Sequence, residues 1–353
     1  MSDPVTVVGA GPAGLACAIA LAHAGKRVVV HERAPRIGSR FHGDFQGLEN
    51  WSDSRDVLDE LRTHGIEATF DRIGVSELTA FDPRGEAFLL RGKRPLYYIV
   101  RRGDVSGSLD RSLLQQALAA GAQIRFLDPM KNVQGSAVYA TGPASADLIA
   151  VGYVFESDMP DGDWLALGDD LAPRGYAYLL VHGGLGTVAV CLFADFNHHP
   201  QYLRRTVEFF RMRVGLSMRN CRRIGGCGSL RLLSSAHHGF RLFAGERAGF
   251  QDALAGFGIR YALRSGLLAA RSLLRGESYD ALWRRELLPM LQAGVANRFL
   301  YGNLGSSGSN PLLRRVSRGD AGDALHRLYR GSMLTRCIYP LIPRANREAA
   351  AAS

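Results

Sequence analysis

The sequence predicts an α/β protein in which a parallel strand–helix–strand unit is interleaved with an antiparallel sheet and followed by a helical region. Three observations predict this class. The apolar run Val5–Val8 leads through a glycine-rich turn into a helical stretch, and a second apolar run ends at His31. Residues 148–196 alternate in polarity and are rich in valine, tyrosine and leucine, which is typical of antiparallel strands. Helical periodicity dominates residues 278–335.

The order of the predicted elements divides the chain into interleaved domains. After a stretch of short strands and turns, the chain is predicted to form a helix over residues 108–120 and a strand over residues 123–126. We assign both to the same domain as the parallel unit. A later strand and a helix up to residue 274 return to it again. We predict a discontinuous first domain of residues 1–65, 96–147 and 230–275, an antiparallel-sheet domain of residues 66–95 and 148–229, and a helical, basic region of residues 276–353.

Length and composition are those of an ordinary globular protein. The 353 residues are 46% hydrophobic and 22% charged, enough to bury a large core. The N-terminus has no basic region before its apolar stretch, and no window holds the roughly 18 uninterrupted apolar residues of a spanning helix. We therefore expect a cytoplasmic protein. The five cysteines are scattered without a CxxC pair, so we expect neither a disulfide framework nor a metal site.

The chain carries a net charge of +10, and only three of its 43 basic residues are lysine. No nucleic-acid-binding module accompanies this charge, so we expect no nucleic-acid partner. The arginines gather late and alternate with apolar runs such as Leu312-Leu313 and Cys337-Ile338-Tyr339. This pattern leaves two interpretations open: a solvated, arginine-rich surface, or a peripheral contact with anionic lipid on the inner face of a membrane.

The turn after the first predicted strand reads Gly9-Ala10-Gly11-Pro12-Ala13-Gly14. In this pattern the first glycine allows the tight turn, the second lets the backbone approach a pyrophosphate, and the third lets helix and strand pack closely. Glu32 stands at the end of the second strand, followed by Arg33. A carboxylate there accepts hydrogen bonds from ribose hydroxyls and disfavours a 2′-phosphate. The motif therefore predicts a Rossmann-like unit for FAD or NAD rather than NADP, with both residues among its ligands.

A second glycine-rich segment lies more than 200 residues later. It runs from Leu242-Phe243-Ala244-Gly245-Glu246 to Gly256-Phe257-Gly258-Ile259. Here the chain resembles the flavoprotein superfamily that includes geranylgeranyl reductases and aromatic hydroxylases, in which a late strand–Gly–Asp segment precedes a glycine turn and a helix. The resemblance implies FAD as the cofactor and a glutathione-reductase-type fold. It also implies that Glu246, a glutamate as in amine-oxidase and phytoene-desaturase flavoproteins, holds a ribityl hydroxyl, and that the helix N-terminus faces the flavin pyrimidine ring.

Two further segments resemble the reductase branch. Val100-Arg101-Arg102 with Leu109-Asp110-Arg111-Ser112-Leu113-Leu114 is similar to its VxR…(F/L)DxxL segment, which implies that Arg102, or Arg101 in its place, contacts FAD. An arginine that only caps the following helix is the alternative. Pro173-Arg174-Gly175-Tyr176-Ala177-Tyr178 is similar to the PxxYxW(x)FP element, although its tryptophan and final Phe-Pro are missing. That similarity implies that Tyr176 and Tyr178 line the substrate pocket, and we place Phe45 there as well.

Residues 38–51 are dense in polar side chains where related reductases carry a Cys-Gly-Gly segment close to the flavin. This chain has no cysteine there, so the cysteine-dependent step of those reductases is not carried over. His42 is a candidate proton donor because its unperturbed pKa lies near neutrality, and Asp44 is the second candidate. The alternative is that these residues bind the FAD pyrophosphate and ribityl chain. To that binding segment we assign Gly38, Arg40 and Phe41.

The resemblance implies an FAD-dependent oxidoreductase that transfers hydride from flavin N5 to a carbon–carbon double bond of a hydrophobic, lipid or isoprenoid-like substrate. The first alternative is a flavin-dependent monooxygenase acting on an aromatic or polyketide-like substrate. The second is a non-catalytic flavin-binding accessory protein. No second GxGxxG motif is present for a nicotinamide, so we expect electrons from transient NAD(P)H or from a ferredoxin- or flavodoxin-type donor. The positive charge would steer such an acidic carrier protein.

Overall fold

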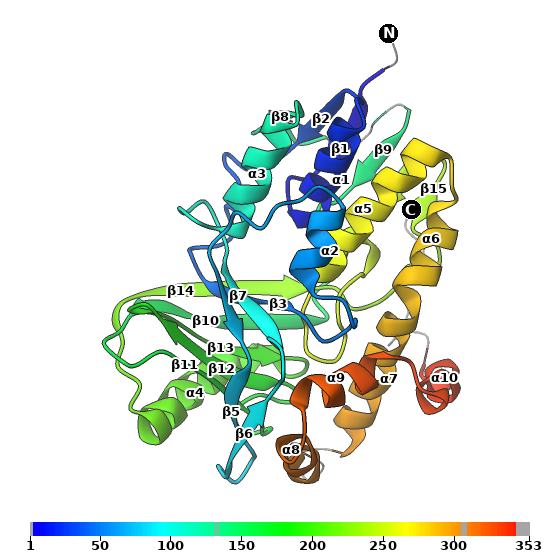
Figure 1. Ribbon diagram of the computed structural model, residues 1–353. Helices are drawn as coiled ribbons and strands as arrows, with labels where there is room; N and C mark the ends of the chain where they lie inside the picture. The colour runs from blue at the N-terminus through cyan, green and yellow to red at the C-terminus, as the bar shows by residue number, and fades with distance from the viewer. Residues whose placement is uncertain (1–2, 131–132, 134, 305–308, 344–353) are drawn as a thin grey trace.

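Figure 1 shows the computed structural model, which describes residues 3–130, 133, 135–304 and 309–343. Its described strands form sheets of six, seven and three strands, and helices cover them. The predicted fold class is confirmed: a Rossmann-like unit is interleaved with an antiparallel sheet, and a helical region follows. Within the described residues, no helix is both long and apolar enough to cross a bilayer.

The six-stranded sheet contains the first glycine turn. Its strand β1 (Val5–Val8) pairs in parallel with β2 (Val28–His31) on one side and with β9 (Ala137–Tyr139) on the other. Helix α1 (Pro12–His23) connects β1 to β2, as the strand–helix–strand prediction requires. The outer strands are β8 (Gln123–Arg125) beyond β2, and β16 (Arg241–Phe243) and β15 (His237–His238) beyond β9.

Helix α1 packs against two other helices, which explains why it is apolar almost all round. These helices are α3 (Leu109–Ala119) and α5 (Ile259–Arg275). Helix α3 begins after Ser108, whose Oγ accepts the backbone N–H of Arg111 at 3.2 Å. Helix α5 comes close to α1 at Gly266, where a Cβ would lie 2.0 Å from the carbonyl oxygen of Ala13. A glycine is therefore required at this crossing.

The seven-stranded sheet has the order β14-β10-β13-β12-β11-β5-β6, and all its neighbours are antiparallel except β11 and β5. On β12 (Tyr176–His182), Ala177, Leu179 and Val181 pack with helix α4 (His199–Val214). Leu180 belongs to an apolar cluster on the opposite face. The other strands are β5 (Glu77–Phe81), β6 (Ala87–Arg91), β10 (Leu148–Glu156), β11 (Gly162–Ala166), β13 (Leu185–Leu192) and β14 (Arg219–Gly228).

The three-stranded sheet joins the other two. It has the order β3-β7-β4, with β3 (Phe45–Glu49), β7 (Tyr97–Arg101) and β4 (Arg72–Val75), and helix α2 (Val57–Thr63) follows β3. The chain first passes to the seven-stranded sheet between β4 and β5, and it enters that sheet again between β9 and β10. The predicted domain boundary at residue 66 thus lies ahead of the point where the chain changes sheet.

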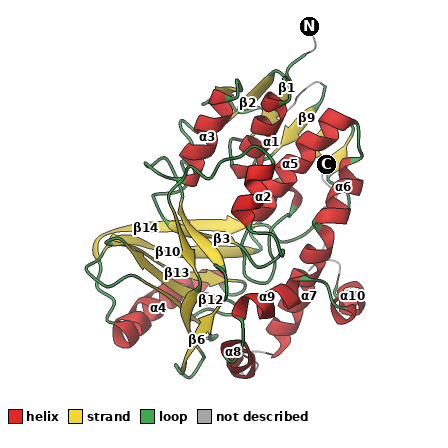
Figure 2. Ribbon diagram, viewed as in Figure 1, coloured by secondary structure: helices red, strands yellow, loops and turns green. Residues whose placement is uncertain are grey.

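The C-terminal region is helical, as predicted. Figure 2 shows its helices on the side of the molecule opposite α4. Helices α8 and α9 pack against β6, and α9 and α10 against α7. The bounds are α6 (Tyr279–Glu286), α7 (Leu288–Leu304), α8 (Ser309–Ser317), α9 (Ala321–Tyr329) and α10 (Met333–Ile338).

Candidate functional site

The glycine turn between β1 and α1 has two glycines that the protein's own packing requires and one that it does not. A Cβ on Gly9, whose φ is +104°, would lie 2.4 Å from the carbonyl oxygen of Ala140. A Cβ on Gly14 would lie 1.9 Å from the carbonyl oxygen of Gly9. A Cβ on Gly11 would meet nothing within 4 Å, and no side chain caps α1 there. The open space in front of the uncapped helix start is where an anion would lie.

Glu32 lies beside this turn, immediately after β2. Its carboxylate accepts the backbone N–H of Ala10 at 2.8 Å and that of Ala34 at 2.9 Å. The side chain therefore fixes the turn and remains next to the open space. Its role toward a ribose stays a prediction. Arg33, the next residue, is exposed and makes no contact that would place it in the site.

The second motif packs directly onto the first. Gly245 has a φ of +62°, its N–H donates to Ser265 Oγ at 2.8 Å, and a Cβ there would lie 3.1 Å from that of Ala13. Gly245, and with it the backbone of Glu246, therefore lies near the first turn of α1, and the carboxylate of Glu246 extends from this point. It also lies at the start of α5, because a Cβ on Gly258 would be 3.5 Å from Glu246 Oε1. Two helix starts and one carboxylate thus converge on one place.

At the point where the two helix starts meet, Glu246 is a residue whose hydrogen bonding is incomplete. Its buried Oε2 has no hydrogen-bond partner among the described residues, and the nearest cation, Arg40 Nη2, is 3.7 Å away. Burial raises the pKa of Glu246 above its ordinary value, although Arg40 and Arg102 oppose the shift. A buried carboxylate oxygen without a donor is unfavourable by about 1–3 kcal/mol. A hydroxyl group of a ligand would satisfy it.

The loop between the second motif and α5 is held by Asp252, which the sequence analysis missed. Asp252 is 1% exposed and accepts the backbone N–H groups of Leu254 at 2.8 Å and Ala255 at 2.9 Å. It also accepts the hydroxyl of Tyr329, on α9, at 2.7 Å. Burial raises the pKa of Asp252 to about 6, even though these hydrogen bonds lower it.

The carbonyl groups of the same loop are held from two other elements. Arg298, on α7, donates to the carbonyl oxygens of Ala253, at 2.9 Å, and Leu254. The hydroxyl of Tyr176, on β12, donates to that of Ala255 at 2.5 Å. The loop is therefore fixed by the seven-stranded sheet and the C-terminal helices together. Tyr176, predicted as a pocket residue, is in this way tied to the loop.

Phe257, in the glycine turn before α5, faces the three-stranded sheet. Its ring lies 4.7 Å from that of Trp51 and 6.3 Å from that of Tyr97. A Cβ on Gly47, in β3, would lie 2.3 Å from the Phe257 ring, so this glycine makes room for it. The partly buried side chain packs against an apolar cluster, and the cofactor contact of Phe257 stays a prediction. Gly256 has a φ of +78°, which a glycine adopts without strain.

Arg102 is fully engaged by the protein. It is 4% exposed, bonds Asp110 at 2.9 Å through both Nε and Nη2, and donates to Gln46 Oε1 at 3.0 Å. Its guanidinium lies 4.3 Å from the ring centre of Phe41, and that of Arg40 lies 4.6 Å from the same centre. These contacts favour the alternative in which Arg102 positions the start of α3. The backbone of Gly38 packs closely against that of Gly103, since a Cβ on Gly38 would lie 2.7 Å from Gly103 Cα.

The two candidate proton donors differ in their surroundings. Asp44 is 4% exposed, and its two oxygens accept the backbone N–H of His42 at 2.9 Å and Gln46 Nε2 at 2.8 Å. Both carboxylate oxygens of Asp44 therefore already accept hydrogen bonds from the protein. The ring of His42 makes no hydrogen bond to another described residue. Phe45 is 5% exposed, and its N–H donates to Thr187 Oγ1 at 2.9 Å, so it joins β3 to β13 within the core.

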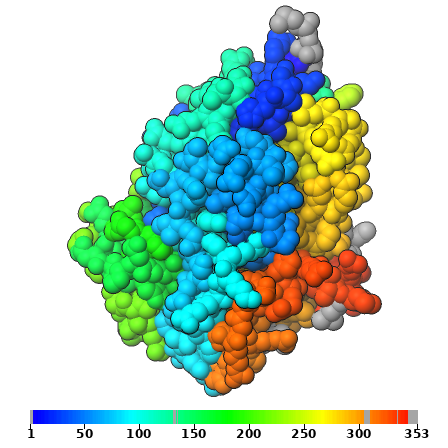
Figure 3. Space-filling model, viewed as in Figure 1, coloured from blue at the N-terminus to red at the C-terminus, as the bar shows by residue number. Residues whose placement is uncertain are grey.

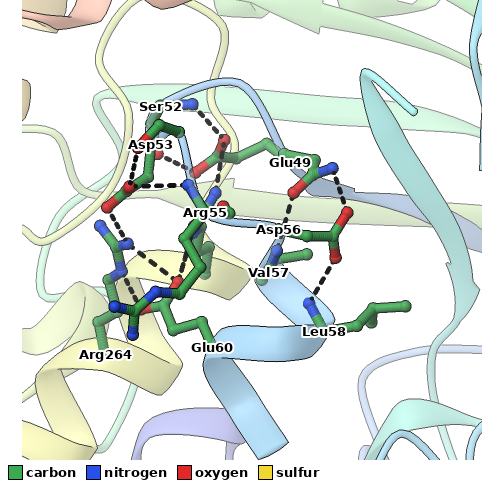
Figure 4. Close-up of polar contacts among 12 residues, drawn as sticks. Glu49, Ser52, Asp53, Arg55, Asp56, Val57, Leu58, Glu60 and Arg264 are labelled. Carbon is green, nitrogen blue, oxygen red and sulfur yellow. Dashed lines mark hydrogen bonds and ion pairs between the residues drawn. The ribbon is translucent and has the colours of Figure 1, made fainter. Parts of the chain in front are cut away.

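A buried ionic network lies beneath the site and was also missed (Figure 4). Arg260, on α5, is 1% exposed and donates to Glu60 Oε2 from Nε at 3.0 Å and from Nη2 at 2.7 Å. Arg264, one turn later, bonds Glu60 and, at 2.6 Å, Asp53. Despite burial, hydrogen bonds from Arg55 and Arg264 lower the pKa of Asp53 to about 2. The i, i+4 arginines of α5 are the signal that could have revealed this network.

A cavity of about 310 Å³ lies between the segment before β12 and α7. It borders the predicted pocket motif through Pro173 and Arg174 rather than through Tyr176 and Tyr178. Arg298 donates to the carbonyl oxygens of Arg174 and Ala253 and so links the lining of this cavity to the loop of Asp252. The lining residues are Asp169, Pro173, Arg174, Ala194, Tyr301 and Gly302.

Comparison with known proteins identifies the fold. A family profile described as an NAD(P)-binding Rossmann-like domain matches residues 7–46. No curated protein matches the chain by sequence. Among solved structures, a geranylgeranyl bacteriochlorophyll reductase-like protein from Thermoplasma acidophilum is similar, with a TM-score of 0.75 and 17% identity over 96% of this chain and 99% of that one. The chain has the fold of this group of proteins.

Two other similar structures carry different names. A probable FAD-dependent monooxygenase from Pseudomonas aeruginosa, pqsL, has a TM-score of 0.67 and 15% identity over 90% of this chain and 99% of that one. The flavin-dependent brominase Bmp2 has a TM-score of 0.64 and 16% identity over 96% of this chain and 97% of that one. The fold prediction is therefore confirmed, while these three names include a reductase-like protein, a monooxygenase and a halogenating enzyme.

Proposed function

We propose that this chain binds FAD and is an oxidoreductase that reduces carbon–carbon double bonds of a lipid or isoprenoid-like substrate. The observation that carries the proposal is that the uncapped starts of α1 and α5 meet at Gly245, next to Glu246, whose buried Oε2 has no hydrogen-bond partner among the described residues. Helix starts attract anionic groups, and a buried carboxylate oxygen without a donor requires a hydroxyl. A dinucleotide with a hydroxylated chain supplies both, and the residues present fit FAD.

The residues at the helix starts would divide the binding of FAD between them. The open space at Gly11 and the first N–H groups of α1 suit the pyrophosphate. Glu32 suits the adenosine ribose, and Glu246 suits a ribityl hydroxyl. The backbone at Gly258 and Ile259, where no side chain caps α5, suits the pyrimidine edge of the flavin ring. When bound, FAD supplies the hydride.

The surroundings of Phe257 support an apolar substrate. A buried cluster joins the three-stranded sheet, the facing side of the seven-stranded sheet and helices α8 and α9. Its members are mostly aliphatic and aromatic, and Tyr178 packs against it. Burial raises the pKa of Tyr178 well above its ordinary value, which keeps the hydroxyl neutral. His42, whose ring is not engaged, remains the candidate proton donor, and NAD(P)H or a ferredoxin- or flavodoxin-type protein the electron donor.

Two experiments test this proposal in turn. The purified protein should be yellow, with the absorption bands of flavin and about one FAD released per chain on denaturation. A protein that stays colourless after incubation with FAD would exclude the whole proposal. Lipid extracts from cells with and without the gene should then differ by about two mass units per reduced bond.

The second experiment also separates the alternative function. Similarity of fold to a probable FAD-dependent monooxygenase favours hydroxylation as the competing reaction. In that case the product gains one oxygen atom, and oxygen uptake with NAD(P)H increases when an aromatic compound is added. A yellow protein that changes no lipid and consumes no oxygen would indicate the flavin-binding accessory protein.

A further inference from the structure

The outer face of the last described helix carries an apolar stripe. Helix α10 runs on into a short 3-10 turn, Tyr339–Leu341. Met333 and Leu341 are 83% and 80% exposed, and Cys337 between them is exposed as well. Met333 and Cys337, four residues apart in α10, lie on one face of the helix, and the exposed Leu341 follows in the 3-10 turn. We call this set the α10 stripe.

The opposite face of the same segment is fixed to the core. Tyr339 and Ile342 are buried in a small cluster with Ala253, Val295 and Ala296. Thr335 is also buried, and Ser332 caps the start of α10 by accepting the N–H of Thr335 at 3.2 Å. The outward direction of the α10 stripe is therefore set by packing on the other side.

The chain segment that carries the stripe has only positive charges. Arg327, Arg330 and Arg336 are exposed, and none of them forms an ion pair with a carboxylate among the described residues. Residues 324–343 contain no aspartate and no glutamate. Figure 3 shows the red end of the described chain on the right-hand side of the lower half of the molecule. By contrast, Arg271 near the end of α5 is paired with Glu277 at 2.8 Å.

We propose that the α10 stripe docks on the surface of a bilayer that contains anionic lipid. The apolar side chains would enter the boundary between headgroups and acyl chains, and the arginines would lie at the phosphates. Exposed apolar side chains complement the acyl chains of such a bilayer, and unpaired arginines in a segment without acidic residues complement its phosphates. The cluster that anchors the stripe includes Ala253, which follows Asp252 in the loop before α5. The inference does not depend on the proposed function.

The test uses the full chain and sedimentation with vesicles. One set is phosphatidylcholine alone, and the other is phosphatidylcholine with phosphatidylglycerol at a ratio of about three to one. We expect binding to the second set only, weakened by added salt. The double variant Met333→Glu, Leu341→Glu should bind at least about tenfold more weakly, because each substitution removes an apolar contact and adds a repelled charge.

A matched control is available on another helix. Met212, on α4, is 74% exposed and stands between Arg211 and Arg213. Met212→Glu changes the same type of residue and the net charge in the same direction, so it should leave vesicle binding unchanged. The proposal is overturned if the wild-type chain ignores phosphatidylglycerol, or if Met212→Glu weakens binding as much as Met333→Glu does. Thermal unfolding of each variant shows whether the fold is intact.

Discussion

Helices α1 and α5 both start at a glycine without a side-chain cap, yet the segments before them are held in different ways. The turn before α1 is fixed by residues close in sequence, namely its own glycines and Glu32. The loop before α5 is fixed by Tyr176, Arg298 and Tyr329, which come from three other elements. The first helix start is thus a local structure, and the second is assembled by tertiary contacts.

The largest expected effect comes from the ionic network that holds α5. Arg260→Met should lower the free energy of unfolding by about 3–5 kcal/mol, because it leaves the buried Glu60 with a single arginine partner. Urea unfolding measures the change. Arg275→Met, at an exposed position of the same helix, is the control and should change it by less than about 0.5 kcal/mol. A loss below about 1 kcal/mol in Arg260→Met would show that Arg264 alone supports the site.

The same contrast explains what the sequence could predict. The strand–helix–strand unit, the α3 helix with its Ser108 cap and the antiparallel strands follow from local patterns, and all were expected. The positions of Glu32 and Glu246 beside the two glycine turns were also predicted, from the two glycine-rich motifs. Asp252 and Arg298 act through partners distant in sequence, which no local pattern indicates, and the spacing of Arg260 and Arg264 indicates a charged stripe on α5 without naming its partner Glu60, 200 residues away. Phe45 was placed with the pocket residues, and in the structure it lies buried on β3, where its N–H donates to β13.

Substitutions in the first turn should separate packing from ligand binding. Gly14→Ala should cost about 3 kcal/mol of stability, since the new Cβ would lie 1.9 Å from a backbone oxygen that cannot move aside. Gly11→Ala should change the stability of the flavin-free protein by less than about 1 kcal/mol, because a Cβ there meets nothing. It should nevertheless weaken FAD binding, measured by flavin fluorescence. Equal effects of the two substitutions on flavin-free stability would contradict this division.

In the loop before α5, Tyr329→Phe tests the hydrogen bond from the Tyr329 hydroxyl to Asp252. The pKa of Asp252 is raised to about 6 in the folded protein, so the folded state holds this proton more tightly than the unfolded state. Its contribution to stability is therefore present at acidic pH and is lost as pH rises from about 4 through 6. Removing the hydroxyl should cost about 1–2 kcal/mol at pH 7, where it donates to a charged group, and less at pH 5. Urea unfolding at both pH values gives the comparison, and an equal loss at both would argue against a charged Asp252.

The smallest effects on stability are expected from replacing Glu32 or Glu246 by glutamine. The first substitution should lower the stability of the flavin-free protein, and the second should not. Glu32→Gln loses about 1 kcal/mol, because an amide oxygen cannot accept both the Ala10 and the Ala34 N–H groups. Burial raises the pKa of Glu246, so its charged form opposes folding increasingly as pH rises toward neutrality. Glu246→Gln should therefore leave the flavin-free protein unchanged or more stable by up to about 1 kcal/mol, while it weakens FAD binding. Calorimetric melting and FAD titration of both variants measure the pair. If Glu246→Gln destabilised the flavin-free protein as Glu32→Gln does, Glu246 would be a packing residue, and its unpaired oxygen would not indicate a ligand.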